Sequence, residues 1–338
     1  MSPTLGGNMF ESCHHRPCER RTAIVYCIFL AVAYVGALYV LVPSKVRNLT
    51  RDHHLQIQYR SMASILVSAL ALMSYPYMFC VSNIEEEPNA DNNNQMFSLR
   101  QIMFQPYFLT AVLFHTMTLY LGPIVASLVR VFEIRKLSVA QGKAVGSYPM
   151  VVFQQLLQPD LHSFLTPDSK DEFWKNTRNY IVAPWTEELV FRGCMIPPLL
   201  ASGMSVAKAS MVAPLFFGVA HVHHALTRLA KGEPLAPVLF ITTFQFLYTS
   251  LFGMYASYAF IRTGSVLAVT VSHAYCNWMG LPDLSFVQIR HPMYQYRILL
   301  LASFLTGVFT FKYFLKSDDL LPLPPRLPTL IVQMTDGQ

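Results

Sequence analysis

The sequence has few charged residues. Asp, Glu, Lys and Arg together make up 13% of its 338 residues, whereas soluble domains carry roughly 25%. Cysteine is also scarce, since the chain holds six, and four of them lie in apolar segments, where a thiol behaves as a small hydrophobe. These deficits exclude a soluble nucleic-acid binder, a disordered chain and a secreted disulfide scaffold.

Long apolar runs take the place of the missing charge, because 53% of the residues are hydrophobic. A run of about 20 apolar residues can cross the hydrocarbon core of a membrane as a helix. We therefore predict an all-α, multi-pass membrane protein with about eight helices that cross or nearly cross the bilayer. The runs lie at about residues 22–42, 61–82, 107–129, 180–200, 209–226, 235–261, 266–281 and 298–315.

The whole chain, residues 1–338, is expected to form a single polytopic domain. Its polar N-terminus (1–21) and its Pro-rich tail (317–338) are expected to lie outside the bundle. The polar residues inside apolar segments are concentrated at about 178–281, which we take as the catalytic core.

The net charge of +6 is explained by basic residues in the loops between the apolar runs. Lys45, Arg47, Arg51 and Arg60 follow the first apolar run, whereas the loop after the second run is acidic. The positive-inside rule therefore places the loop after the first run in the cytosol. This distribution explains the basic balance without a nucleic-acid partner.

Ionisable residues within an apolar segment are costly in hydrocarbon and are functional candidates for that reason. Glu187, Glu188 and Arg192 lie in such a segment. Glu188 and Arg192 are four residues apart and can pair on one helix face, whereas Glu187 lies about 100° around the helix. A carboxylate left partly unpaired in a desolvated site has a raised proton affinity and suits a general base. The alternative is an ion cluster that only stabilises the helix.

Three histidines end the next apolar run, at His221, His223 and His224. His221 lies deepest in the run, and this position favours a functional role. His223 and His224 fit the interfacial end of a span equally well, because a basic loop follows them.

A third polar pair, His273 and Asn277, is four residues apart in a helix that is otherwise apolar and rich in small residues. Both side chains can donate hydrogen bonds into a bundle interior. Alone, the pair could equally be a contact between membrane helices, where such bonds contribute about 0.6 kcal/mol each. Together, the three groups supply a base, an imidazole that can orient water and donors for an oxyanion. Amide hydrolysis requires these three functions.

In this order, the three motifs resemble those of the type II CAAX prenyl endopeptidases, a family of glutamate-dependent intramembrane proteases. The motifs are Glu187-Glu188-x-x-x-Arg192, Phe217-x-x-x-His221 and His273-x-x-x-Asn277. Any one of them is a weak signal, whereas the ordered set is specific. The resemblance is motif-specific from about 178 to 280 and general over the remaining spans.

The resemblance implies eight transmembrane helices around a cavity, in the endoplasmic reticulum membrane. It implies hydrolysis that removes the last three residues of prenylated Cys-a-a-X proteins such as Ras and Rho-type GTPases. Besides these substrates it implies contact with membrane lipid, and it requires no metal or other cofactor.

We assign roles to the motif residues as a hypothesis on this basis. Glu187 deprotonates a water that His221 orients, and His273 and Asn277 donate to the oxyanion. Glu188 and Arg192 support the site, and Arg192 could instead hold the C-terminal carboxylate of the substrate. The candidate walls of an isoprenoid groove, each of which could also be ordinary helix packing, are Phe216, Phe217, Met195, Phe244 and Phe246.

Two other functions stay open from the residues alone. A zinc-dependent membrane protease could use Glu187, His221 and His273 as ligands, although the sequence contains no H-E-x-x-H. A transporter or channel could line an ion path with the same polar residues, although transporters often show paired repeats and none is visible here.

Overall fold

The computed structural model describes residues 19–79, 107–140, 167–220 and 223–316. Within these ranges the regular structure is helical and contains no β-strand, so the all-α prediction is confirmed. His221, residues 1–18 of the polar N-terminus and the tail 317–338 lie outside the described residues.

The helices and their bounds are α1 (Arg20–Val40), α2 (Ser44–Arg47), α3 (His54–Phe79), α5 (Tyr107–Leu119), α6 (Leu121–Ala140), α9 (Lys170–Thr177), the π-helical η1 (Arg178–Val182), α10 (Ala183–Glu188), the π-helical η2 (Leu189–Cys194), α11 (Ile196–Ala201), α12 (Val206–Ala220), α13 (His223–Ala230), α14 (Leu235–Thr263), α15 (Val266–Met279), the short 3₁₀ turns η3 (Ser285–Val287) and η4 (Tyr294–Tyr296), and α16 (Arg297–Lys316).

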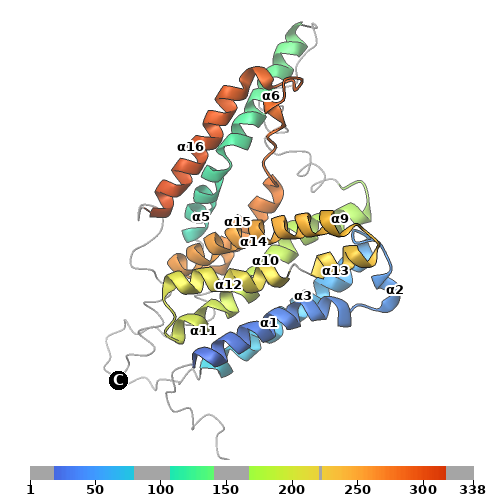
Figure 1. Ribbon diagram of the computed structural model, residues 1–338, viewed down its shortest axis with the longest axis vertical. Helices are drawn as coiled ribbons and strands as arrows, with labels where there is room; N and C mark the ends of the chain where they lie inside the picture. Colours follow the sequence, from blue (N-terminus) through green and yellow to red (C-terminus); the bar gives the residue numbers. More distant parts are fainter. Residues whose placement is uncertain (1–18, 80–106, 141–166, 221–222, 317–338) are drawn as a thin grey trace, which may run out of the picture.

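The helices form two groups that meet at α15 (Figure 1). Helices α1 and α3 pack side by side along the lower edge, and α10 to α14 lie above them. Helices α5, α6 and α16 form the upper part, where α5 packs against α15. The larger core cluster joins the segment 189–200 to α1, α3, α12, α14 and α15, and it also includes Phe108 and Val112 of α5.

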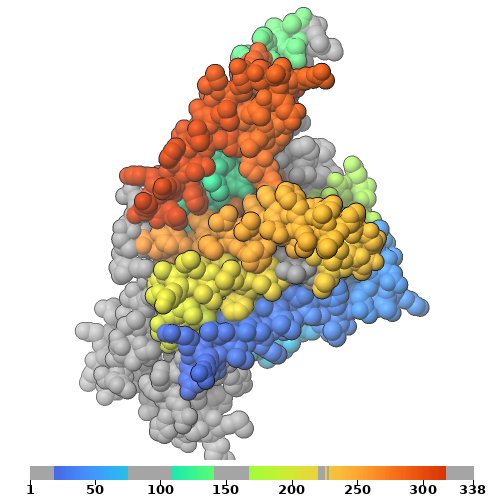
Figure 2. Space-filling model, viewed as in Figure 1, coloured from blue at the N-terminus to red at the C-terminus, as the bar shows by residue number. Residues whose placement is uncertain are grey.

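Three described helices are long and apolar enough to cross a membrane, at Arg20–Val40, Leu235–Thr263 and Tyr294–Lys316. A fourth span results if the bent pair α5 and α6 counts as one. These helices expose apolar side chains: Phe240 of α14, for example, is 74% exposed, and α14 crosses the middle of the face in Figure 2. The protein is therefore a helical membrane protein, with fewer long straight spans among the described residues than the eight expected.

Prolines account for part of this difference. We expected a single span at about 107–129, but the chain bends by 71° between Phe108–Leu119 and Leu121–Ala140. Pro123 lies in the first turn of α6, where its missing N–H and its ring prevent a continuous helix from α5. Similarly, Pro184 and Pro197 lie in the first turns of α10 and α11.

The region expected as one helix at 180–200 stays helical from η1 through α10 and η2, and a turn at Met195 separates it from α11. Two π-helical stretches, η1 and η2, flank α10. π-Helical turns are rare and occur often at functional sites. Here they lie directly before and after the segment that carries Glu187 and Glu188.

A tight turn positions α15, the helix of the third motif. Gly264 ends α14 with φ +67°, a left-handed conformation that glycine adopts without strain. Ser265 then caps α15, since its side chain accepts a hydrogen bond from the backbone N–H of Ala268. Because the start of α15 is fixed, the positions of His273 and Asn277 along the helix axis are fixed as well.

Gly253 lets α14 approach α12 closely. A Cβ atom at this position would lie 2.8 Å from Cβ of Pro214 and 3.0 Å from Nη2 of Arg192. Small residues at helix contacts allow such close approach in membranes. The glycine thus couples helix packing to the buried arginine of the first motif.

Candidate active site

A cavity of about 460 Å³ lies between the helices that carry the first and third motifs. Its size falls within the range of roughly 300–1,000 Å³ typical of ligand sites. Glu187, His273 and Asn277 line it, together with apolar and aromatic side chains from α1, α3, α12 and α14. The structure thus brings the first and third motifs to one cavity, which Phe217 of the second motif also lines.

Glu188 is the centre of a buried polar cluster. Its Oε1 accepts a hydrogen bond from Nη1 of Arg192 at 3.1 Å, and Nδ1 of His273 lies 2.7 Å from the same oxygen. The side chains of Glu188 and Arg192 are 0% and 1% exposed. The ion pair that the four-residue spacing predicts is therefore present, and it binds the third motif as well.

Glu187 differs from its neighbour in exposure and partners. Its side chain is 19% exposed and lines the cavity, and its Oε2 lies 3.9 Å from Nε2 of His273. It has no ion pair with Arg192 like that of Glu188. The sequence prediction that Glu187 points away from the Glu188–Arg192 pair agrees with this geometry.

The imidazole of His273 lies between the two glutamates. Because Glu188 is a carboxylate paired with arginine, it accepts, and the proton of Nδ1 is donated to it. The second nitrogen, Nε2, then faces Glu187. Phe252 packs on the ring at a centroid distance of 5.0 Å, and these contacts fix the orientation of the imidazole.

A polar network fixes the far side of α15. Ser272, next to His273, lies 2.6 Å from Oγ1 of Thr116 on α5. The same Thr116 oxygen lies 2.9 Å from the hydroxyl of Tyr255 on α14. These bonds hold α15 between α5 and α14, so His273 is presented to the cavity by a fixed helix.

Asn277 reaches the cavity one turn beyond His273. Its Nδ2 donates to the backbone carbonyl of Asn179 at 2.9 Å, in the π-helical segment η1. An amide group has two N–H donors, and Asn277 lines the cavity, so one N–H is available to a ligand.

Phe217 is the one predicted groove residue that lines the cavity. Its ring packs edge-on against Phe191, with centroids 5.0 Å apart, and the guanidinium of Arg192 lies 4.9 Å from its centre. The ring therefore shields the buried ion pair on the cavity side.

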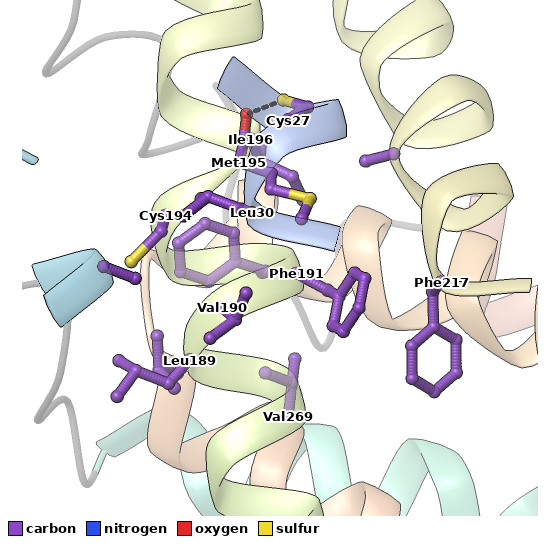
Figure 3. Packing of buried hydrophobic residues seen from close by; sticks show 14 of the residues in the cluster. Cys27, Leu30, Leu189, Val190, Phe191, Cys194, Met195, Ile196, Phe217 and Val269 are labelled. Atoms are coloured by element: carbon purple, nitrogen blue, oxygen red, sulfur yellow. Dashed lines mark hydrogen bonds between the residues drawn. The ribbon is translucent and has the colours of Figure 1, made fainter. Parts of the chain in front are cut away.

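The other four predicted groove residues do not line this cavity. Met195 is fully buried, and its carbonyl accepts a hydrogen bond from the thiol of Cys27 on α1 (Figure 3). The π-helical segment that precedes it changes the angular spacing of the residues. Phe216 packs against the core cluster, Phe246 lies where a Cβ on Gly218 would meet it, and Phe244 is 49% exposed on α14.

Comparison with known proteins places these residues in a family. A family model described as "Type II CAAX prenyl endopeptidase Rce1-like" matches residues 170–279. "CAAX prenyl protease 2" of Homo sapiens is 33% identical over 289 residues, which cover 85% of this chain and 78% of that protein. The chain belongs to the type II CAAX prenyl endopeptidases.

Other members of the CAAX prenyl endopeptidase family are also similar to the chain. "CAAX prenyl protease 2" of Arabidopsis thaliana is 31% identical over 276 residues, 78% of this chain and 80% of that protein. That of Saccharomyces cerevisiae is 38% identical over 143 residues, 40% of this chain and 44% of that protein. No solved structure matches the chain.

The endopeptidase cavity also contains residues that the sequence did not single out. Aromatic walls come from Tyr34, Phe191, Tyr248 and Phe252, and three arginines line it as well: Arg51, Arg60 and Arg178. The available signal was the basic loop after the first apolar run, which was interpreted only as a marker of orientation. His221, the histidine of the second motif, lies outside the described residues.

Proposed function

We propose that this CAAX prenyl endopeptidase removes the C-terminal tripeptide of prenylated Cys-a-a-X proteins, such as Ras and Rho-type GTPases, through a water activated by Glu187. One observation carries the assignment of the base. Of two adjacent glutamates, Glu188 is fully buried and paired with Arg192, whereas Glu187 is partly exposed and lines the cavity. Glu187 is therefore the carboxylate that water can reach.

The proposed reaction begins with transfer of a proton from water to Glu187, while His221 orients the water. The resulting hydroxide attacks the carbonyl carbon of the prenylated cysteine and forms a tetrahedral oxyanion. The C–N bond then breaks, and Glu187 returns its proton to the departing amine. General base catalysis of this kind contributes about 10²- to 10⁴-fold in rate.

His273 and Asn277 are the proposed oxyanion donors. Asn277 has one N–H engaged with Asn179 and one available. His273 donates Nδ1–H to Glu188, so it can donate to an oxyanion through Nε2 only when the ring carries a second proton. Loss of one such donor lowers the rate by about 10²- to 10³-fold.

Glu188 and Arg192 are positioning residues in this scheme. They are too deeply buried to meet a substrate, but Glu188 holds the ring of His273. Arg192 in turn donates a hydrogen bond to Glu188 and places a positive charge beside its carboxylate. This arrangement supports the first of the two roles considered for Arg192 rather than binding of the substrate carboxylate.

An isoprenoid chain requires an apolar surface next to the scissile bond. Phe191, Phe217 and Phe252 provide such a surface in the cavity. We propose that these rings replace the larger predicted groove set, of which Phe217 alone lines the cavity. The finer predictions of about eight helices around the cavity, of the endoplasmic reticulum membrane and of contact with its lipid belong to the same proposal.

The test is hydrolysis of a farnesylated Cys-a-a-X peptide by the purified full chain, with the released tripeptide measured by mass spectrometry. Glu187→Gln should bind the peptide and release tripeptide at least about 10²-fold more slowly. Glu233→Gln, which changes a partly exposed glutamate paired with Arg228 outside the cavity, is the matched control and should retain full activity. Near-normal turnover by Glu187→Gln would refute the assignment of the base.

A further inference from the structure

The cavity carries more positive than negative charge. Among the described residues that line it, three are arginines, Arg51, Arg60 and Arg178, and a single one, Glu187, is acidic. A cluster of like charges in a partly enclosed site costs free energy unless an anion balances it. The ligand of this cavity is therefore expected to carry a negative group.

Arg178 is already engaged. Its Nη1 donates to Oδ1 of Asp52 at 3.0 Å, and its Nε donates to Oδ1 of Asn179 at 2.9 Å. These bonds hold it at the start of η1, beside the carbonyl that Asn277 contacts. Arg178 thus stabilises the wall of the cavity and is not free to bind a ligand.

Arg51 and Arg60 have no ion pair with the acidic side chains of the described ranges. Nε of Arg60 is buried and lacks a hydrogen-bond partner in the same part of the chain. Its guanidinium lies 5.9 Å from the ring centre of Tyr39 and interacts electrostatically with Arg51 and Arg178. Arg51 is also near enough to Glu187 to interact with its charge.

Arg192, the cation of the first motif, cannot serve the same purpose. It is 1% exposed, donates to Glu188 and does not line the cavity. The two arginines from the basic loop and the start of α3 are therefore the cations available to an anionic ligand.

We propose that Arg51 and Arg60 bind the C-terminal α-carboxylate of the substrate, an inference that rests on the function proposed above. Three residues separate this carboxylate from the scissile bond, and three extended residues span about 10 Å. A carboxylate held by the arginines while the cysteine carbonyl faces Glu187 would set the length of the released peptide. The proposal accounts for release of a tripeptide and predicts that cleavage depends on a free C-terminus.

The experiment compares two farnesylated Cys-a-a-X peptides that differ only at their ends, one with a free carboxylate and one with a C-terminal amide. The full chain is assayed in phosphatidylcholine vesicles, and tripeptide release gives kcat and KM. Wild type should show a KM about 10- to 100-fold lower for the carboxylate peptide, because charge-assisted bonds are stronger than neutral ones.

Arg51→Gln and Arg60→Gln should raise KM for the carboxylate peptide and leave KM for the amide peptide unchanged. The discrimination, which is the ratio of the two KM values, should therefore fall. Arg60→Lys should retain part of it, because the charge remains. Arg47→Gln is the matched control, since Arg47 is an exposed arginine of α2 that does not line the cavity. A variant that merely loses its structure would lower the turnover of both peptides together.

Three outcomes decide the matter. Equal KM values of wild type for both peptides would overturn the proposal, and this measurement needs no variant. Discrimination that survives both Gln substitutions would overturn it as well, while tripeptide release itself would continue to support the proposed function. If the substitutions instead abolish a dependence on added phosphatidylserine, the arginines bind a lipid headgroup and the carboxylate assignment is wrong.

Discussion

Nδ1 of His273 lies 2.7 Å from Oε1 of Glu188, although 85 residues separate them in the sequence. The same oxygen accepts the hydrogen bond from Arg192. One buried carboxylate therefore serves both an ion pair within its own helical region and the orientation of an imidazole on another helix. In the proposed reaction this contact matters for Glu187 as well, because the ring faces Glu187 with its other nitrogen.

Glu188→Gln should destabilise the protein and slow the reaction. Removal of one partner of a buried ion pair leaves an uncompensated charge on Arg192 and costs about 3–5 kcal/mol. The double variant Glu188→Gln/Arg192→Met should recover much of the stability, because no buried charge remains alone, but not the turnover, because His273 loses its charged acceptor. Thermal unfolding in detergent and kcat measure the two effects.

The pair Arg228–Glu233 provides the control for that experiment. Its atoms lie 2.8 Å apart, but the side chains are 34% and 38% exposed. Glu233→Gln should therefore change stability by less than about 1 kcal/mol. An equal loss of stability in Glu188→Gln and Glu233→Gln would contradict the claim that burial makes the Glu188–Arg192 pair more important for stability.

Gly253→Ala should reduce both stability and activity. The new Cβ would lie 2.8 Å from Pro214, whose ring cannot move aside, and 3.0 Å from Nη2 of Arg192. Overpacking of this kind costs about 1–3 kcal/mol, and separation of α14 from α12 should disturb the arginine. Gly36→Ala on α1 is the control, since a Cβ there would meet no atom within 4 Å. The prediction fails if both variants retain wild-type unfolding midpoints and turnover.

The contact between α3 and α9 should depend on pH. Asp171 lies on the polar helix α9, outside the apolar spans, and the backbone N–H and the ring of His54 hold its pKa below the usual value. A lowered pKa means that the carboxylate stabilises the fold above the ordinary Asp pKa of about 3.9, and that this stabilisation disappears as the pH falls through the lowered pKa.

Asp171→Asn should therefore lower the unfolding midpoint at pH 7 and converge with wild type at acidic pH. Asp168→Asn, on the same exposed segment just before α9, is the control. The measurement is the unfolding midpoint in detergent across the acidic range. A difference between Asp171→Asn and wild type that stays constant down to the lowest pH would argue against the linkage.

Removal of metal ions should leave tripeptide release unchanged. In the proposed reaction the base is a carboxylate, and Nδ1 of His273 is engaged with Glu188. The described side chains that approach one another like metal ligands are His53, His54 and Asp171, not Glu187 with His273. Assay after treatment with a strong chelator and removal of the chelator checks this expectation. A loss of activity that Zn²⁺ restores would favour the zinc protease instead.

Much of the local geometry of the site can be predicted from the sequence. The pairing of Glu188 with Arg192 follows from their four-residue spacing, because an α-helix brings such residues together whatever surrounds it. The apolar character of the chain likewise follows from composition. By contrast, hydropathy does not reveal the break near Pro123, because the apolar run continues through it. The π-helical segments before Met195 likewise leave no mark in a hydrophobic pattern.

Composition and the order of the motifs are enough to predict a helical membrane protein of the CAAX prenyl endopeptidase family and to show which ionisable residues lie in apolar segments. The contact of His273 with Glu188, the packing of Met195 against α1 and the cavity that Arg51 and Arg60 share with Glu187 became visible in the folded protein. The reason is physical: helix geometry fixes neighbours within about one turn, whereas contacts across many residues depend on how closely helices pack, as α14 does against α12 at Gly253.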